Sequence, residues 1–180
     1  MTQGREDDFA DVLGDLTDDI VIQHPDQMPG AVFYPNARLN FAENLLRRRD
    51  DTAALMFRGE TGVERTMTGA ELYALVSRLK QAMHEAGIKS GDRVAAYLPN
   101  VPEAIAAMLA TASLGAVWSS CSPDFGTQGV LDRFGQIEPK IVFAADQYFY
   151  NGRAIECTER VAEVRANLPT VDSVIILPYD

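Results

Sequence analysis

Residues 93–98 read Arg-Val-Ala-Ala-Tyr-Leu, and Pro99-Asn100 follow at once. This run does not alternate between apolar and polar residues, so it predicts a strand buried on both faces of a sheet. Similar runs occupy residues 116–121, 141–145 and 174–177. Helical patterns separate these runs, and they predict helices over Asn100–Gly115, Thr127–Glu138 and Arg153–Leu168. The order predicts an α/β fold: an open, mostly parallel sheet with helices on both faces.

Upstream of this sheet, the pattern is more local. Thr68 and Glu71 form a capping-box pair, and apolar residues then recur at helical spacing up to Gly87. Residues 53–57 and 63–67 flank a glycine-containing turn and predict a small β-hairpin. A helix is expected over Leu39–Arg49, capped by Asn40, with three arginines in its last turn.

The N-terminal region is polar and contains several prolines. We expect residues 1–37 to form an irregular arm with at most one short helix, and residues 38–180 to form the α/β domain. Residues 1–30 carry eight acids and one base, which fits an acidic docking tail or a solvated surface segment. The solvated segment is the favoured interpretation.

Composition restricts the function. The chain has 180 residues, of which 47% are apolar, so it can bury a core and is not disordered throughout. A formal charge of −10 argues against binding to nucleic acid or to an anionic membrane. Two cysteines are too few for a disulfide framework and favour the cytoplasm. We expect neither a signal peptide nor a membrane span.

In an open parallel sheet, ligands bind beyond the carboxyl ends of the strands. Three loops are predicted at that edge: residues 98–101, Ser122–Gly126, and 146–152 continuing into Arg153. Small residues in the second loop allow a ligand to approach the backbone. In the third, aromatic side chains and Arg153 suit an adenine ring and a phosphate. Equally, Arg153 could begin a helix and pair with Glu156.

Common catalytic motifs do not occur in residues 1–180. There is no phosphate-binding P-loop, no dinucleotide fingerprint and no zinc-protease motif. His24 and His84 are far apart in sequence and have no recognisable metal or nucleophile partner. Cys121 ends a strand and could be a nucleophile, but a buried, unreactive thiol is favoured. We therefore predict no catalytic and no metal-ligating residue here.

Several stretches carry a family resemblance. Phe33–Arg47 (Phe-Tyr-Pro-Asn-Ala-Arg-Leu-Asn-Phe-Ala-Glu-Asn-Leu-Leu-Arg) and Gly91–Ala104 (Gly-Asp-Arg-Val-Ala-Ala-Tyr-Leu-Pro-Asn-Val-Pro-Glu-Ala) resemble blocks of the acyl-CoA synthetases of the AMP-forming adenylating superfamily. Gly115–Gly126 and Leu131–Lys140 are similar to the branch that joins acetoacetate to CoA. Acetate and propionate ligases usually carry a glycine-rich stretch in place of Ser122-Pro-Asp-Phe.

The resemblance implies a two-step ligase. A carboxylate attacks the α-phosphate of ATP, and the CoA thiol then displaces AMP, with magnesium neutralising the phosphates in the first step. The CoA site would include Ser122, Pro123, Asp124 and Phe125 along the CoA path, with Tyr150, Gly152 and Arg153 near its nucleotide. Arg133 matches a recurrent family arginine that is expected to be structural.

Other family motifs are absent from residues 1–180. The Ser/Thr/Gly-rich phosphate loop, the acidic adenylate motif, the magnesium-binding glutamate and the C-terminal catalytic lysine lie further along the chain in the family. We therefore expect an N-terminal portion of a ligase that is inactive alone, holds only a partial CoA site, and self-associates through an uncovered sheet edge. ATP and magnesium would act only in the full-length enzyme. Alternatives are a ligase portion for acetate or propionate, and a non-catalytic CoA-binding or structural remnant.

Overall fold

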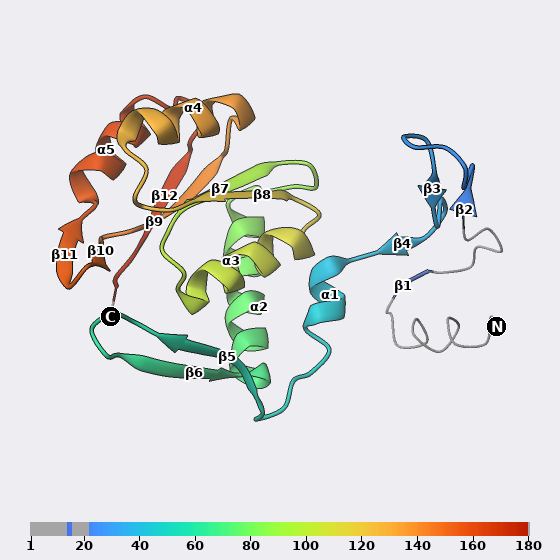
Figure 1. Ribbon diagram of the computed structural model, residues 1–180, viewed down its shortest axis with the longest axis horizontal. Coiled ribbons are helices and arrows are strands. Elements are labelled where there is room, and N and C mark those ends of the chain that lie inside the picture. The colour runs from blue at the N-terminus through green and yellow to red at the C-terminus, as the bar shows by residue number, and fades with distance from the viewer. Residues whose placement is uncertain (1–13, 16–21, 180) are drawn as a thin grey trace. The chain divides into compact units, whose positions relative to one another are not determined.

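The four apolar runs pair side by side in the computed structural model, which describes residues 14–15 and 22–179 (Figure 1). They form strands β7 (Arg93–Tyr97), β8 (Val117–Cys121), β9 (Ile141–Ala145) and β12 (Ser173–Leu177). The spatial order is β12-β9-β7-β8, and every neighbouring pair is parallel. The predicted parallel sheet is confirmed.

Helices cover both faces of this sheet, as the α/β pattern predicted. Helices α2 (Gly69–Glu85) and α3 (Pro102–Ser113) lie on one face, and α4 (Thr127–Ile137) and α5 (Thr158–Ala166) lie on the other (Figure 1). Side chains alternate along a strand, so Ala95 and Tyr97 share a buried cluster with Val130 and Phe134 of α4 and Val161 of α5. Val94 and Ala96 are also fully buried, which explains why β7 has no polar face.

The segment before the sheet also follows its sequence signals. Strands β5 (Ala53–Arg58) and β6 (Glu64–Thr68) form the predicted antiparallel hairpin. At the start of α2, the Thr68 side chain accepts from the Glu71 N–H, and the Glu71 carboxylate accepts from the Thr68 N–H. This reciprocal cap explains why the helix begins where the motif predicted.

One predicted helix is wrong in its first part. The expected loop at 146–152 and helix from Arg153 are instead a hairpin of β10 (Gln147–Tyr150) and β11 (Arg153–Glu156), and α5 begins only at Thr158. The turn residues Asn151 and Gly152 have φ angles of 52° and 72°. Two successive positive φ angles define the tight hairpin turn that Asn-Gly favours, and this turn chemistry outweighed the helical spacing.

Two further boundaries need correction. Helix α1 covers only Phe41–Leu45, so the arginines at 47–49 lie beyond its last turn and not within it. Asn40 caps it as predicted, but the helix buries only Ala42, and the polar residues 47–52 offer no apolar side chain that would extend its face. Helix α3 begins at Pro102, so Val101 and not Asn100 occupies the N-cap position, and no side chain caps this end.

The chain divides into two compact units, residues 1–47 and 48–180. The described part of the first unit contains two-residue strand pairs. These join β1 (Gly14–Asp15) to β4 (Arg38–Leu39), and β2 (Ile22–Gln23) to β3 (Val32–Phe33). The helix that the arm could hold, and most of its acids, fall outside the described residues. The expected boundary after residue 37 stays a prediction.

In the described part of the chain, no helix has the length and apolar character needed to cross a bilayer.

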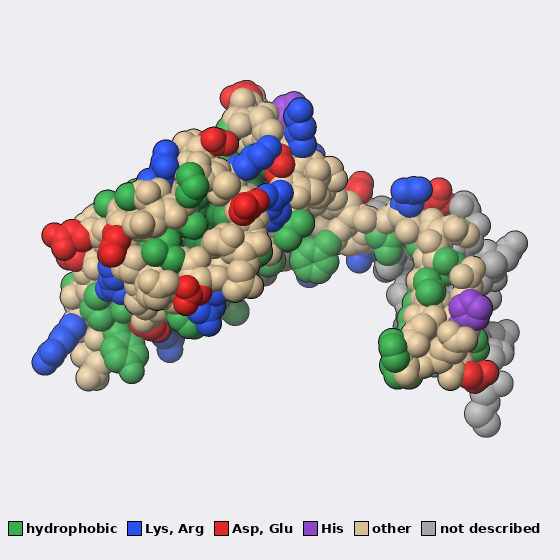
Figure 2. Space-filling view, turned by 90° about the horizontal axis from the view of Figure 1, so that it is seen from above, with side chains coloured by type: hydrophobic (Ala, Val, Ile, Leu, Met, Phe, Trp, Pro, Cys, Tyr) green, Lys and Arg blue, Asp and Glu red, His purple; other side chains and the backbone are tan. Residues whose placement is uncertain are grey.

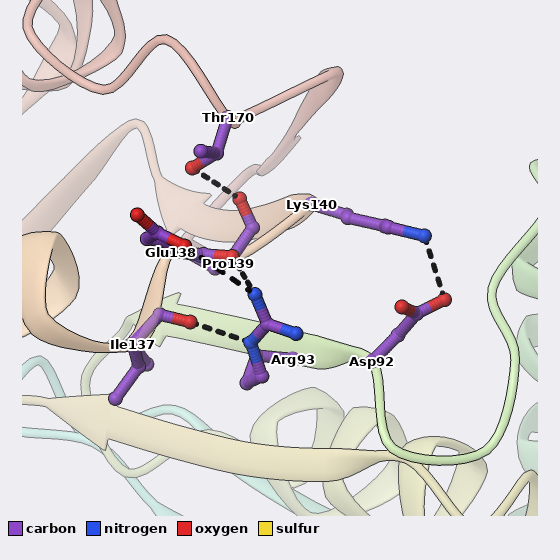
Figure 3. Close-up of polar contacts among 7 residues, drawn as sticks. All are labelled: Asp92, Arg93, Ile137, Glu138, Pro139, Lys140 and Thr170. Atoms are coloured by element: carbon purple, nitrogen blue, oxygen red, sulfur yellow. Dashed lines mark hydrogen bonds and ion pairs between the residues drawn. The ribbon is translucent and has the colours of Figure 1, made fainter.

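Polar contacts join the strands at the edge of the sheet where β7 and β9 begin (Figure 3). Arg93 donates from Nε to the Ile137 carbonyl at 2.6 Å and from Nη2 to the Glu138 carbonyl at 2.9 Å. Glu138 ends α4 in the left-handed conformation, with φ of 49°. Lys140 pairs with Asp92 at 2.9 Å, and Thr170 donates to the Pro139 carbonyl. These contacts occupy the amino-terminal edge of the sheet.

Candidate functional site

At the opposite edge, the turns after the strands converge on one hollow of about 320 Å³, called the rim hollow below. The turn after β7, the turn after β8 and strand β10 each contribute to its wall. Its lining is Leu98, Pro99, Asn100, Ser120, Cys121, Ser122, Pro123, Asp124, Tyr148, Phe149 and Tyr150. The connection after β7 leads to α3 on one face, whereas those after β8 and β9 lead to the other (Figure 1). Ligand sites in open α/β sheets form where connections diverge in this way.

The structure brings some of the predicted site residues together and leaves others outside. Ser122, Pro123, Asp124 and Tyr150 line the rim hollow. Phe125, Gly152 and Arg153 are not part of its lining. The predicted group therefore divides into residues that line the hollow and residues beside it.

The turn after β8 is held by its own polar groups. The Ser122 hydroxyl donates to the Asp124 carboxylate at 2.9 Å, and the Phe125 N–H donates to the Ser122 carbonyl at 3.2 Å. Hydrogen bonds of this kind between neighbouring side chains and backbone stabilise tight turns. The turn therefore presents the side chains of Ser122 and Asp124 in a fixed arrangement.

Tyr97 anchors the same turn from inside the domain. Its side chain is 1% exposed, and its hydroxyl lies 2.8 Å from the Pro123 carbonyl and 2.6 Å from the Phe125 carbonyl. Burial raises the pKa of Tyr97, and the nearby Arg160 guanidinium partly opposes this rise. The hydroxyl therefore stays protonated at neutral pH and donates to the turn.

Arg160, in α5, is a site residue that the sequence did not reveal. Its Nη1 donates to the Pro123 carbonyl at 3.1 Å and to the Tyr97 hydroxyl at 3.2 Å. Tyr148 and Asp124 both line the rim hollow, and the pKa of Tyr148 is raised by burial and then by the Asp124 carboxylate, while the Arg160 guanidinium partly opposes this rise.

Phe125 and its neighbour Arg133 contact each other on the outer side of the turn. The Arg133 guanidinium lies 4.0 Å from the centre of the Phe125 ring, and its Nη1 donates to the Gly129 carbonyl at 2.9 Å. Cation–π contacts of this kind fix both partners. The geometry agrees with the structural role expected for Arg133.

Arg153 follows the tip of the β10–β11 hairpin. It is exposed and lies opposite Tyr150 in the ladder, and no ion pair among the described residues includes it. The alternative of a helix-start arginine is wrong, since Arg153 lies in a strand. Beside it, the Gly152 N–H donates to the Glu60 carboxylate at 3.2 Å, which joins this hairpin to the β5–β6 turn. An exposed guanidinium on a hairpin that is held in this way is suited to bind an anionic ligand.

Cys121 lies in the wall of the rim hollow, but its burial argues against a role as nucleophile. It is buried, and burial raises its pKa to about 11, against a smaller opposing effect of Arg133. A thiol with this pKa is almost entirely protonated at neutral pH. The geometry therefore favours the packing role over the nucleophile.

Comparison with known proteins identifies the chain's relatives. The family described as AMP-binding enzyme matches residues 41–180, which is most of the chain. The chain belongs to this AMP-binding enzyme family. The predicted resemblance to AMP-forming acyl-CoA synthetases is thereby confirmed at the family level.

Individual members of the AMP-binding enzyme family give a finer picture. The chain is 58% identical over 156 residues to the acetoacetyl-coenzyme A synthetase of Rhizobium meliloti (strain 1021), covering 86% of this chain and 23% of that protein. A malonamoyl-CoA synthetase of Penicillium aethiopicum is 37% identical over 166 residues, covering 89% and 23%. The solved acetoacetyl-CoA synthetase from Streptomyces lividans superimposes with a TM-score of 0.82 at 45% identity, covering 88% and 25%. The chain thus spans about a quarter of the length of these relatives.

Proposed function

We propose that residues 48–180 supply part of the coenzyme A site of an ATP-dependent acid–CoA ligase, with acetoacetate as the acid. One observation carries the proposal: the turns after β7 and β8 and strand β10 enclose the rim hollow in a chain 58% identical to an acetoacetyl-coenzyme A synthetase. The complete reaction converts acetoacetate, ATP and CoA into acetoacetyl-CoA, AMP and pyrophosphate. A magnesium ion would neutralise the phosphates of ATP.

The chemistry of the rim hollow fits the neutral, amide-containing arm of CoA. Serine hydroxyls, the Asn100 amide and aromatic rings line it, and no lysine or arginine does. Such a wall can hydrogen-bond amides but cannot compensate phosphate charge. We therefore assign the Ser122–Phe125 turn to the pantetheine arm.

The charged part of CoA needs a cation outside the hollow. Arg153 follows the lining residue Tyr150 by three positions and is exposed, with no ion pair among the described residues. A guanidinium can bind phosphate oxygens with two parallel hydrogen bonds. We assign Tyr150, Gly152 and Arg153 to the nucleotide end of CoA.

Calorimetry with CoA tests this assignment. We expect micromolar binding to the 180-residue chain, with affinity lost in Arg153→Ala and kept in Arg78→Ala, which removes another exposed arginine, from α2. Absence of CoA binding by the unsubstituted chain would refute the site and favour a purely structural role.

Adenylate formation is a separate part of the proposal. The 180-residue sequence contains no phosphate-binding loop, so we propose that this chain alone does not make the adenylate. Acetoacetate-dependent exchange of labelled pyrophosphate into ATP measures that step. Exchange above background by the 180-residue chain would contradict the proposal.

The acid substrate has a second candidate, because the chain is also similar to a malonamoyl-CoA synthetase. A ligase for another short acid, such as acetate or propionate, is therefore the second candidate. Comparing acetoacetate, acetate and propionate in the same exchange assay with a complete ligase that includes this segment would decide between them.

We also propose that the polypeptide self-associates and resides in the cytoplasm. Strands β8 and β12 are the edges of the sheet, and Val117 and Ile176 on them are 50% and 44% exposed. Exposed apolar edge strands favour pairing with a second chain. Light scattering would disprove self-association by showing a monomer.

Both described cysteines are free, which supports a reducing compartment, and cell fractionation checks it.

A further inference from the structure

The strongest unexplained feature near the rim hollow is the cation of Arg160. Its hydrogen-bond partners are neutral oxygens, namely the Pro123 carbonyl and the Tyr97 hydroxyl. No carboxylate among the described residues lies within 4.0 Å of its nitrogens. A half-buried arginine without an ion pair is costly unless its hydrogen bonds are all well made, so these contacts constrain its surroundings strongly.

These contacts join three parts of the chain that are distant in sequence. Arg160 comes from α5 and Tyr97 from β7, and both contact the turn after β8. Tyr97 and Arg160 both reach the Pro123 carbonyl, and Tyr97 also reaches the Phe125 carbonyl. The turn is therefore held at its backbone by one connected network.

The network determines which polar groups of the turn are available to contact a ligand. The carbonyl oxygens of Pro123 and Phe125 accept hydrogen bonds from inside the domain, so they are already satisfied. The Ser122 and Asp124 side chains are left to line the rim hollow. Were the carbonyls released, the turn could rotate, and the hollow would lose its present shape.

We infer that Arg160 is a positioning residue for the coenzyme A site: from inside the domain, it holds the Ser122–Phe125 turn in its binding conformation. The ligand in this statement rests on the proposed function, whereas the effect on the turn does not. Arg160 does not line the hollow, so it acts through Tyr97 and the Pro123 carbonyl. Lysine cannot reproduce the rigid, planar arrangement of donors that reaches both oxygens at once.

Three variants of the 180-residue chain test the inference. Arg160→Met removes every donor at similar length, and Arg160→Lys keeps the charge with fewer fixed donors. Arg165→Met removes the same charge from an exposed position of the same helix. Two readouts are compared: CoA affinity by calorimetry, and hydrogen exchange of the Asp124 and Phe125 amides, which donate within the turn.

We expect Arg160→Met to weaken CoA binding about tenfold and to speed exchange of these two amides about tenfold, while amides of β7 and β9 keep their protection. Arg160→Lys should lie between Arg160→Met and the unsubstituted chain, and Arg165→Met should match the unsubstituted chain. If Arg160→Met does not fold, the intermediate exchange of Arg160→Lys decides the question. Unchanged exchange in the turn in both Arg160 variants would overturn the inference.

The two proposals fail in different ways. If the unsubstituted chain does not bind CoA, the proposed function fails, and amide exchange still reports whether Arg160 holds the turn. If CoA binds but Arg160→Met binds it equally well with an unaltered turn, only the positioning role is disproved.

Discussion

Lys140 Nζ lies 2.9 Å from Asp92 Oδ2, so an ion pair bridges the starts of the adjacent strands β7 and β9. It lies among the contacts of Arg93 and Thr170 at the amino-terminal edge (Figure 3). The rim hollow is at the other end of the same strands. One end of the sheet is thus closed by internal polar contacts, and the other is left open for a ligand.

This pair predicts an acid-sensitive contribution to stability. The hydrogen bond from Lys140, and then that from the Lys89 N–H, lower the pKa of Asp92 in the folded chain. A lowered folded pKa stabilises the fold above the unfolded value, about pH 4, and the contribution is lost as pH falls through the folded pKa. Lys140→Met should therefore be less stable than the unsubstituted chain at pH 7, and this difference should shrink below pH 4. Urea unfolding at several pH values measures it, and a difference that persists undiminished at pH 2.5 would contradict it.

The buried Tyr97 hydroxyl predicts a loss of stability at high pH, whereas the Asp92–Lys140 pair predicts a loss of stability in acid. Because its pKa is raised by burial, the folded chain retains the phenol proton that the unfolded chain loses above about pH 10. The contribution is fully present below that pH and is lost as pH rises through the folded pKa.

The matched variant is Tyr97→Phe, which keeps the ring. It should cost about 2 kcal/mol at pH 7, because the Pro123 and Phe125 carbonyls and Arg160 lose a partner. Its stability should also fall less steeply than that of the unsubstituted chain between pH 9 and 11. Urea unfolding across this range is the measurement, and identical slopes for both proteins would rule out this role for Tyr97.

The raised pKa of Cys121 predicts a thiol that reacts slowly with alkylating agents. A rise from 9.0 to about 11 leaves about one hundredth of the ordinary thiolate at pH 8. In a Cys157→Ala background, Cys121 should react with iodoacetamide at least a hundredfold more slowly in the folded chain than in denaturant. Mass spectrometry of timed samples gives the two rates. Rapid labelling of the folded chain would restore the nucleophile interpretation.

Most of the sheet could be predicted because its signals are local. The run at residues 93–98 and the Thr68–Glu71 cap each specify their element through neighbouring residues, and both predictions are confirmed. The β10–β11 hairpin also had a local signal, since Asn151-Gly152 follows a strand-like aromatic run. The helical spacing that begins at Thr158 competes with this signal, and its extension towards the N-terminus predicts a helix in place of β11.

Arg160 could not be predicted in the same way. Its partners Tyr97 and Pro123 are 63 and 37 residues away, and no motif connects them. Only the β12-β9-β7-β8 order brings α5 and the turn after β8 together on one side of β7. The rim hollow followed from the rule for parallel sheets, whereas the network beneath it depends on tertiary packing that the sequence pattern does not encode.

Two glycines should respond to alanine with opposite signs. Gly152 has a φ of 72° and open space where a Cβ would lie, so Gly152→Ala costs only backbone strain, about 1 kcal/mol. Gly135 is inside α4 with equally open space and no positive φ, so Gly135→Ala should stabilise the chain by about 0.8 kcal/mol through helix propensity. Urea unfolding of the two variants compares them directly.

Gly152→Ala should also weaken CoA binding, because Arg153 follows this turn, whereas Gly135→Ala should not. Equal stabilisation by both substitutions would mean that Asn151-Gly152 does not hold the tight hairpin turn that orients Arg153.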